Sequence, residues 1–155
     1  MINRTSIAAI RTLQYLAGAP PGELVSLRDV AAQLGESATY SAKIARDLVK
    51  AGILHAERGA KGGVRLNQAP EEITLLEVLR ACQGDITTDS CQTRCAPSAT
   101  CSFHQAATEL HNAVLAITSR WTLAQLLVRP VALQPGMHYQ ACRMANLLPV
   151  SGSVS

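Results

Sequence analysis

Apolar residues recur near the start of the chain at a spacing typical of a helix. Between residues 7 and 16 they fall every three positions, which predicts one buried side. The stretch "GAPPGE" that follows breaks this helix, because it combines two prolines with two glycines. The buried stripe is expected to consist of Ile7, Ile10, Leu13 and Leu16.

Two shorter helices are predicted next, each with a start signal and a stop signal. Ser26 followed by Asp29 has the pattern of a capping box, and Gly35 is suited to end that helix. Ser37 can cap the next helix, and Gly52 can adopt the left-handed conformation at its end. The inner faces are expected to contain Leu27, Val30, Ala31 and Leu34, then Ile44, Leu48 and Val49. Two short helices around a glycine-containing turn indicate a helix-turn-helix.

A glycine-rich hairpin is predicted after the third helix. Two short strand-like runs, 53–57 and 64–66, flank a turn that contains Arg58, Lys61 and three glycines. A helix fits the major groove of DNA, and glycines let a hairpin backbone approach phosphates or the minor groove closely. These elements together predict a mostly α fold, a winged helix-turn-helix with a small β-wing.

Positive charge is concentrated in the same half of the chain. Residues 1–70 hold nine Lys and Arg against five Asp and Glu, whereas residues 71–155 hold five against six. Such an excess is also typical of an ordinary solvated surface, and the exposed polar residues could have only that role. The helix, turn and wing together favour duplex DNA as the partner. The predicted DNA-binding residues are Ser37, Thr39, Tyr40, Lys43, Arg46, Arg58, Lys61, Gly62 and Arg65, with the side chains at 39, 40, 43 and 46 opposite the apolar stripe.

The second half predicts a capped helix and a long C-terminal dimerisation helix. Thr74 and Glu77 form a capping-box pattern, Gly84 can close that helix, and Cys82 is expected to be a small core residue. The later apolar residues follow the four-three spacing of a helix that pairs with another helix: Phe103, Ala107, Leu110, Val114 and Ile117. The partner helix could belong to the same chain, but two-fold DNA sites favour a homodimer.

Composition and length limit the class of protein. The 155 residues are 48% hydrophobic and only 3% aromatic, which favours helices packed through aliphatic side chains. No uninterrupted apolar block marks a signal peptide or a membrane anchor, so a cytoplasmic protein is expected. The sequence contains no motif typical of a catalytic site, so an enzyme is not expected. Three regions are predicted: a DNA-binding region over 1–70, a cluster-binding loop with the dimerisation helix over 71–129, and a flexible arm over 130–155.

Cysteines cluster between the two helices of the second half. Cys91, Cys95 and Cys101 are followed by His104, and thiols in the cytoplasm stay reduced. Three interpretations are open: an iron-sulfur cluster, a structural zinc site with the same ligand types, or a thiol switch helped by Arg94. The iron-sulfur interpretation is preferred. A cluster carrier is also possible, but such a protein would not need a basic wing.

Several motifs together resemble the IscR/NsrR family of winged-helix transcription regulators. The resemblance covers residues 1 to about 129. Its motifs are Tyr40-x-x-Lys-Ile, Leu48-x-x-Ala-Gly-Ile-Leu54, Arg58-Gly-x-x-Gly-Gly-Val-Arg-Leu66, Glu72-Ile-Thr-Leu-x-Glu-Val78, the cysteine loop, and Trp121-Thr-Leu-Ala-x-Leu-Leu127.

The resemblance implies a homodimer on a palindromic operator, with an iron-sulfur cluster that controls DNA affinity. It implies Cys91, Cys95 and Cys101 as cluster ligands, and His104 as the fourth ligand, with a 2Fe-2S cluster favoured over a 4Fe-4S cluster. The gap between Cys91 and Cys95 is shorter than the gap usual in the family. The expected function is therefore a transcriptional repressor that senses redox state, nitric oxide or iron-sulfur status, and a thiol-sensing or zinc-stabilised regulator is the alternative.

Overall fold

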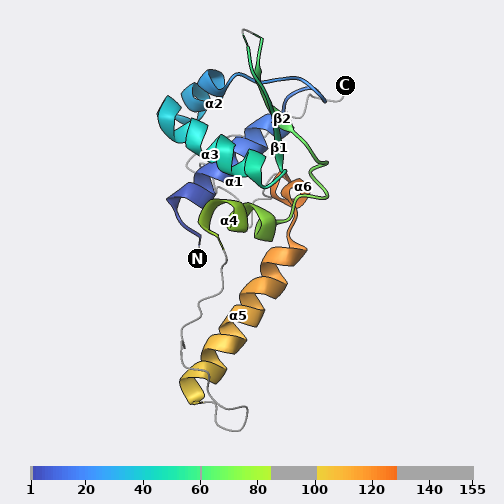
Figure 1. Cartoon of the computed structure of the whole chain (residues 1–155). Coiled ribbons are helices and arrows are strands. Elements are labelled where there is room, and N and C mark those ends of the chain that lie inside the picture. The colour runs from blue at the N-terminus through green and yellow to red at the C-terminus, as the bar shows by residue number, and fades with distance from the viewer. Residues whose placement is uncertain (1, 60, 85–100, 129–155) are drawn as a thin grey trace, which may run out of the picture.

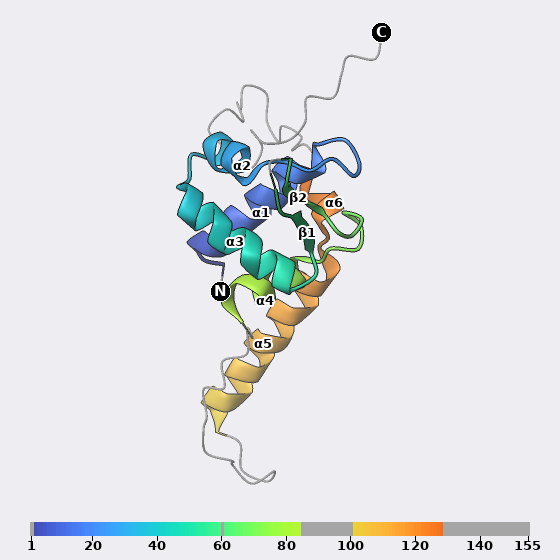
Figure 2. The same cartoon turned by 45° about the horizontal axis from the view of Figure 1, so that its top comes forward.

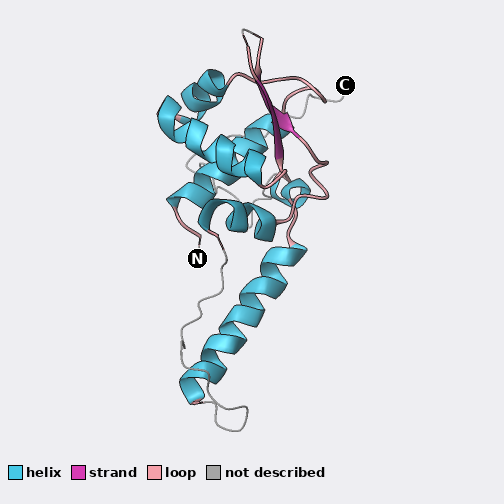
Figure 3. Cartoon of the chain, viewed as in Figure 1, coloured by secondary structure: helices cyan, strands magenta, loops and turns pink. Residues whose placement is uncertain are grey.

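The chain forms a mostly helical body with one small antiparallel sheet (Figures 1 and 3). The computed structural model describes residues 2–59, 61–84 and 101–128. A long helix, α5, extends away from the body in both views (Figures 1 and 2). In chain order the elements are α1 (Arg4–Ala17), α2 (Leu27–Leu34), α3 (Ala38–Lys50), β1 (Leu54–Glu57), β2 (Gly63–Leu66), α4 (Leu75–Gln83), α5 (Ser102–Arg120) and α6 (Leu123–Leu126).

Helices α2 and α3 form the predicted helix-turn-helix, and local signals set their ends. The Ser26 hydroxyl caps α2, and the Ser37 hydroxyl caps α3 by accepting a hydrogen bond from the Tyr40 N–H at 3.2 Å. Gly35 ends α2 with a φ of 66°, and Gly52 follows α3 with a φ of 77°. The start and stop signals in the sequence therefore place both helices correctly.

The hairpin β1–β2 forms the predicted wing, and a third segment pairs with β2. Val25 and Val64 exchange two backbone hydrogen bonds of 2.9 Å, which fix the loop before α2 against β2. Gly63 makes this approach possible, because a Cβ at position 63 would overlap the Val25 carbonyl. Strand β2 is thus attached to the loop that leads into the helix-turn-helix.

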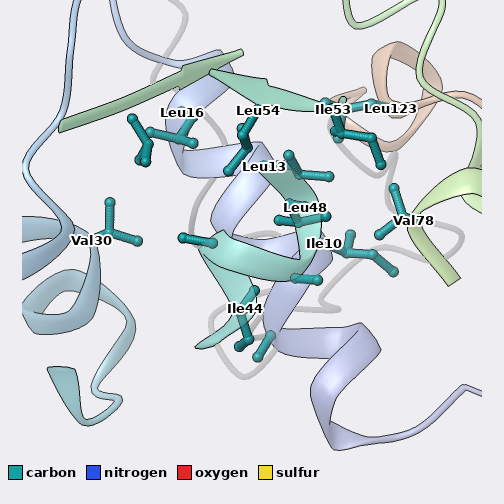
Figure 4. Close-up of a cluster of buried hydrophobic side chains, with 14 of the residues drawn as sticks. Ile10, Leu13, Leu16, Val30, Ile44, Leu48, Ile53, Leu54, Val78 and Leu123 are labelled. Atoms are coloured by element: carbon teal, nitrogen blue, oxygen red, sulfur yellow. The ribbon is translucent and has the colours of Figure 1, made fainter. Parts of the chain in front are cut away.

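One hydrophobic core joins the first and second halves of the described chain (Figure 4). Its buried members include Ile10, Leu13, Leu16, Val30, Ile44, Leu48, Ile53, Leu54, Val64, Ile73, Val78 and Leu123. Ile7 is 43% exposed, so its place in the predicted stripe was wrong. Three residues of an α-helix cover about 300°, so a strict three-residue repeat turns by about 60° at each step and leaves the core. The fully buried Ala9 and Leu13 follow the helical repeat instead.

Helices α4 and α6 are held at their starts by matching capping boxes. Thr74 and Glu77 cap α4, and Thr122 begins α6 in the same way, with a backbone bridge between the two threonines. Gln14 of α1 is 2% exposed and donates a hydrogen bond of 3.0 Å to the Leu126 carbonyl. These contacts fix α6 to the body. Within the described part of the chain, none of the helices has the length and apolar character to span a membrane.

Candidate nucleic-acid interface and cysteine site

One face of α3 carries the predicted contact residues. Thr39, Lys43 and Arg46 are exposed, while Ile44 and Leu48, which are 1% and 0% exposed, lie in the core. Lys50 is also exposed and continues the same spacing of four, three and four residues. Lys50 was not among the predicted contact residues, although this spacing could have identified it. The face therefore presents three cations in succession, a charge pattern that suits a polyanion.

Tyr40 lies elsewhere than expected. Its side chain is half-buried and packs against the core, so its predicted position opposite the apolar stripe was wrong. The hydroxyl donates to Thr5 Oγ1 at 3.4 Å, and the Arg4 guanidinium lies 5.7 Å from the ring centroid. The helical repeat explains this position, since residue 40 is one turn before the buried Ile44. The first turn of α3 is therefore attached to the first turn of α1.

The wing presents charge at its tip and glycine where the backbone is crowded. Arg58 and Lys61 are exposed on either side of residue 60. Arg65 is half-buried on β2, opposite His55 of β1. Gly62 has a structural role, because a Cβ there would overlap the Glu57 carbonyl. The structure thus brings the two tip cations into an exposed hairpin, and it leaves Arg65 nearer the base.

Two of the four predicted cluster ligands lie in the first turn of α5. Cys101 is the N-terminal flanking residue of α5, its thiol is free and exposed, and it makes no capping hydrogen bond. His104 is half-buried and lies three residues further, within the first turn of α5. Cys91 and Cys95 lie outside the described residues. The described part of the chain accordingly holds no group of three or more metal-ligating side chains.

Cys82 differs from the cysteines of the loop. It packs against the core from the inner side of α4, as predicted. Burial, with a smaller contribution from the Asp47 carboxylate, raises the pKa of the Cys82 thiol to about 11. This thiol therefore stays protonated at neutral pH.

Large apolar side chains remain exposed along α5. Phe103 is 69% exposed, Leu110 is 62% exposed and Ile117 is 52% exposed. These residues belong to the predicted helix-pairing seam. No described element of the same chain covers these three side chains.

A family model and curated relatives match most of the chain. The Rrf2 family, described as "Iron-dependent Transcriptional regulator", matches residues 2–129. The HTH-type transcriptional regulator NsrR of Bacillus subtilis (strain 168) is 30% identical over 123 residues, which cover 77% of this chain and 84% of that protein. The NsrR of Bacillus licheniformis is 29% identical over 124 residues, which cover 77% of this chain and 87% of the relative.

Solved structures share the fold. CymR, the global cysteine regulator of B. subtilis, has a TM-score of 0.67 at 22% identity, covering 81% of this chain and 95% of CymR. IscR of T. potens has a TM-score of 0.66 at 22% identity, covering 82% of this chain and 85% of IscR. At these identities the likeness concerns the fold alone, and it confirms the predicted mostly α, winged-helix class.

The family match also confirms the predicted resemblance. The matched model and the NsrR relatives are transcription regulators, which act by binding and not by catalysis, so the expectation that this chain is not an enzyme is confirmed. The chain belongs to the Rrf2 family of transcription regulators.

Proposed function

We propose that this chain is a DNA-binding repressor whose operator affinity is controlled by an iron-sulfur cluster. The observation that carries the proposal is the exposed cationic face of α3 beside a wing with two cations at its tip. Lys43, Arg46 and Lys50 would contact DNA along the recognition helix, and Arg58 and Lys61 would contact the backbone from the wing.

A homodimer on a palindromic operator fits the exposed seam of α5. Phe103, Leu110 and Ile117 would pack against the same residues of a second copy, because such a large apolar surface is unfavourable in water. Two copies would present two recognition helices. Their separation would then set which spacing between half-sites can be bound.

The donors at the start of α5 fit an iron-sulfur cluster. Cys101 has a free, exposed thiol, and His104 lies three residues further in the first turn of α5; Cys91 and Cys95 would supply the other two ligands. When bound, such a cluster supplies a centre that gains and loses electrons, and a 2Fe-2S form is proposed ahead of a 4Fe-4S form. Cys101 and His104 would then hold the loop against the start of α5. A gain or loss of the cluster would therefore affect both the loop and the seam on α5.

Two cysteine-to-alanine variants test the cluster proposal. Cys101→Ala and Cys82→Ala each remove one thiol, but only Cys101 is a proposed ligand. Both variants and the wild type would be reconstituted without air, and iron, acid-labile sulfide, zinc and visible absorption measured on each sample. We expect wild type and Cys82→Ala to hold matched iron and sulfide, and Cys101→Ala to lose most of both.

DNA binding is measured on the same samples with a duplex selected from a random 30-base-pair library by the reconstituted wild type. Fluorescence anisotropy should give different affinities for the reconstituted and metal-free wild type, and equal affinities for Cys101→Ala after both treatments. Zinc without iron in the wild type would indicate a structural site. A metal-free protein whose affinity changes on oxidation would indicate a thiol switch, and either result contradicts the cluster proposal.

A further inference from the structure

We propose that the first turn of α1 transmits the state of the cysteine loop to the recognition helix, with Ser6 and Gln83 as positioning residues for DNA binding. The first turn of α1, residues 3–6, contacts the last residue of α4 on one side and the first turn of α3 on the other. This inference rests on the proposed function, since it needs a signal that arrives through residues 85–100.

The contact with α4 is buried on the Ser6 side, and the Ser6 hydroxyl both donates and accepts a hydrogen bond there. Ser6 is 0% exposed, and its hydroxyl donates to Asn3 Oδ1 at 3.2 Å while it accepts a hydrogen bond from the Gln83 side-chain amide. Asn3 Oδ1 also accepts the Ser6 N–H at 2.9 Å, which caps α1. A buried hydroxyl that lost Gln83 would keep an unmet acceptor site, so the contact is costly to break.

The contact with α3 comes from the two residues before Ser6. Thr5 accepts the Tyr40 hydroxyl, and Arg4 lies over the Tyr40 ring. Arg4 also pairs with Glu36 in the turn before α3, at 3.3 Å, where the Glu36 side chain is only 14% exposed. The start of the recognition helix is therefore held by the same helical turn that holds Gln83.

The position of Gln83 explains why the path can carry a signal. Gln83 is the last residue of α4, and the chain then enters the segment that contains Cys91 and Cys95. Both views place the N-terminal end of α1 beside α4 (Figures 1 and 2). If a change in the loop moves the end of α4, the turn at 3–6 moves with it, because its backbone is helical and capped. Tyr40 then shifts, and with it the cationic face of α3.

The test compares Gln83→Ala with Gln105→Ala, which removes an exposed glutamine from α5. For each protein, the affinity for the selected duplex is measured in the reconstituted form and in the metal-free form. The readout is the ratio of the stronger of these two affinities to the weaker. A residue that only stabilises the fold would lower both affinities together and leave the ratio unchanged. We expect the ratio to fall by at least about fivefold in Gln83→Ala, the lower end of typical allosteric coupling, and to stay at the wild-type value in Gln105→Ala.

Tyr40→Phe tests the other end of the path, because it keeps the ring and removes the bond to Thr5. If one path carries the signal, adding Gln83→Ala to Tyr40→Phe should lower the ratio less than Gln83→Ala lowers it alone. A Gln83→Ala protein with the wild-type ratio would overturn the inference and leave the proposed function standing. A wild type with a ratio of one would instead overturn the proposed function.

Hydrogen exchange in the metal-free protein tests, without any cofactor, whether the contact between Gln83 and Ser6 affects the start of α3. Gln83→Ala should accelerate exchange in peptides that cover residues 38–43, and Gln105→Ala should not. Acceleration confined to peptides at 3–8 and 79–84 would show that the contact is local and would overturn the inference.

Discussion

At the scale of single residues, burial separates the chemistry of Cys82 from that of Cys101. Only a thiolate reacts readily with an alkylating reagent, and the raised pKa of Cys82 keeps the thiolate scarce. Cys101 is exposed at the start of a helix, where a reagent can reach its sulfur. The two thiols therefore report on different parts of the fold.

We expect iodoacetamide to alkylate Cys101 of the metal-free protein much faster than Cys82 at pH 8. At this pH, three units below the Cys82 pKa of about 11, only about one Cys82 in a thousand is ionised. Peptide mass spectrometry at timed intervals measures both rates. In urea the two rates should become similar, and equal rates in the native protein would contradict the burial of Cys82.

Gly63 is a residue whose replacement should damage the attachment of β2 to the loop before α2. Gly63→Ala would push against the Val25 carbonyl, so we expect a loss of about 1–3 kcal/mol in the free energy of unfolding. Gly18→Ala is the matched control, because its Cβ would meet only ordinary contacts and its φ of −81° suits alanine. Urea denaturation followed by circular dichroism measures both; an unchanged midpoint for Gly63→Ala would show that the wing can shift freely.

At the scale of elements, α3 combines a buried side with a cationic side. Ile44 and Leu48 hold the helix in the core, and the exposed residues at 39, 43, 46 and 50 face away from it. Charge on such a face contributes to binding mainly through release of counterions from DNA. Substituting one cation should therefore change the salt dependence of binding as well as the affinity.

Lys50→Ala should weaken binding to the selected duplex and lower the slope of log affinity against log salt concentration by about two, about one for each copy of the proposed dimer. Lys50 is exposed at the end of α3, so little loss of stability is expected. Arg80→Ala removes an exposed cation from α4 and is expected to leave the slope unchanged. Anisotropy titrations at several salt concentrations give the slope, and equal slopes for wild type and Lys50→Ala would remove Lys50 from the interface.

At the scale of the whole molecule, α5 is an element whose apolar side chains no other described part of the chain covers. Its apolar side chains at 103, 110 and 117 are more than half exposed, while Thr118 near its end is buried against the body. A second copy of the chain is the proposed cover. The same contact would set the distance between two recognition helices.

Leu110→Lys should convert the proposed dimer into a monomer, because it places a charge in the middle of the seam. Asn112→Lys adds the same charge about 200° around the helix, on an exposed position outside the seam, and should stay dimeric. Light scattering after size exclusion measures the mass of each. A Leu110→Lys protein with twice the chain mass would place the dimer contact elsewhere.

The sequence by itself determined the ends of the elements and the sides of most helices. Ser37, Thr74 and Gly35 act through atoms a few residues away, so their capping roles can be predicted without knowledge of the fold. Gly62 of the wing is also a local signal, since a Cβ there would overlap the Glu57 carbonyl five residues earlier, whereas the need for Gly63 comes from the distant Val25.

The tertiary structure alone decided which long-range partners these elements have. Ile7 and Tyr40 were placed wrongly for a different, local reason, since the helical repeat by itself gives both positions. The contacts Gln14 to Leu126 and Gln83 to Ser6 join residues more than seventy positions apart. No repeat or spacing encodes such a pair, since the backbone must first fold to bring the two side chains together.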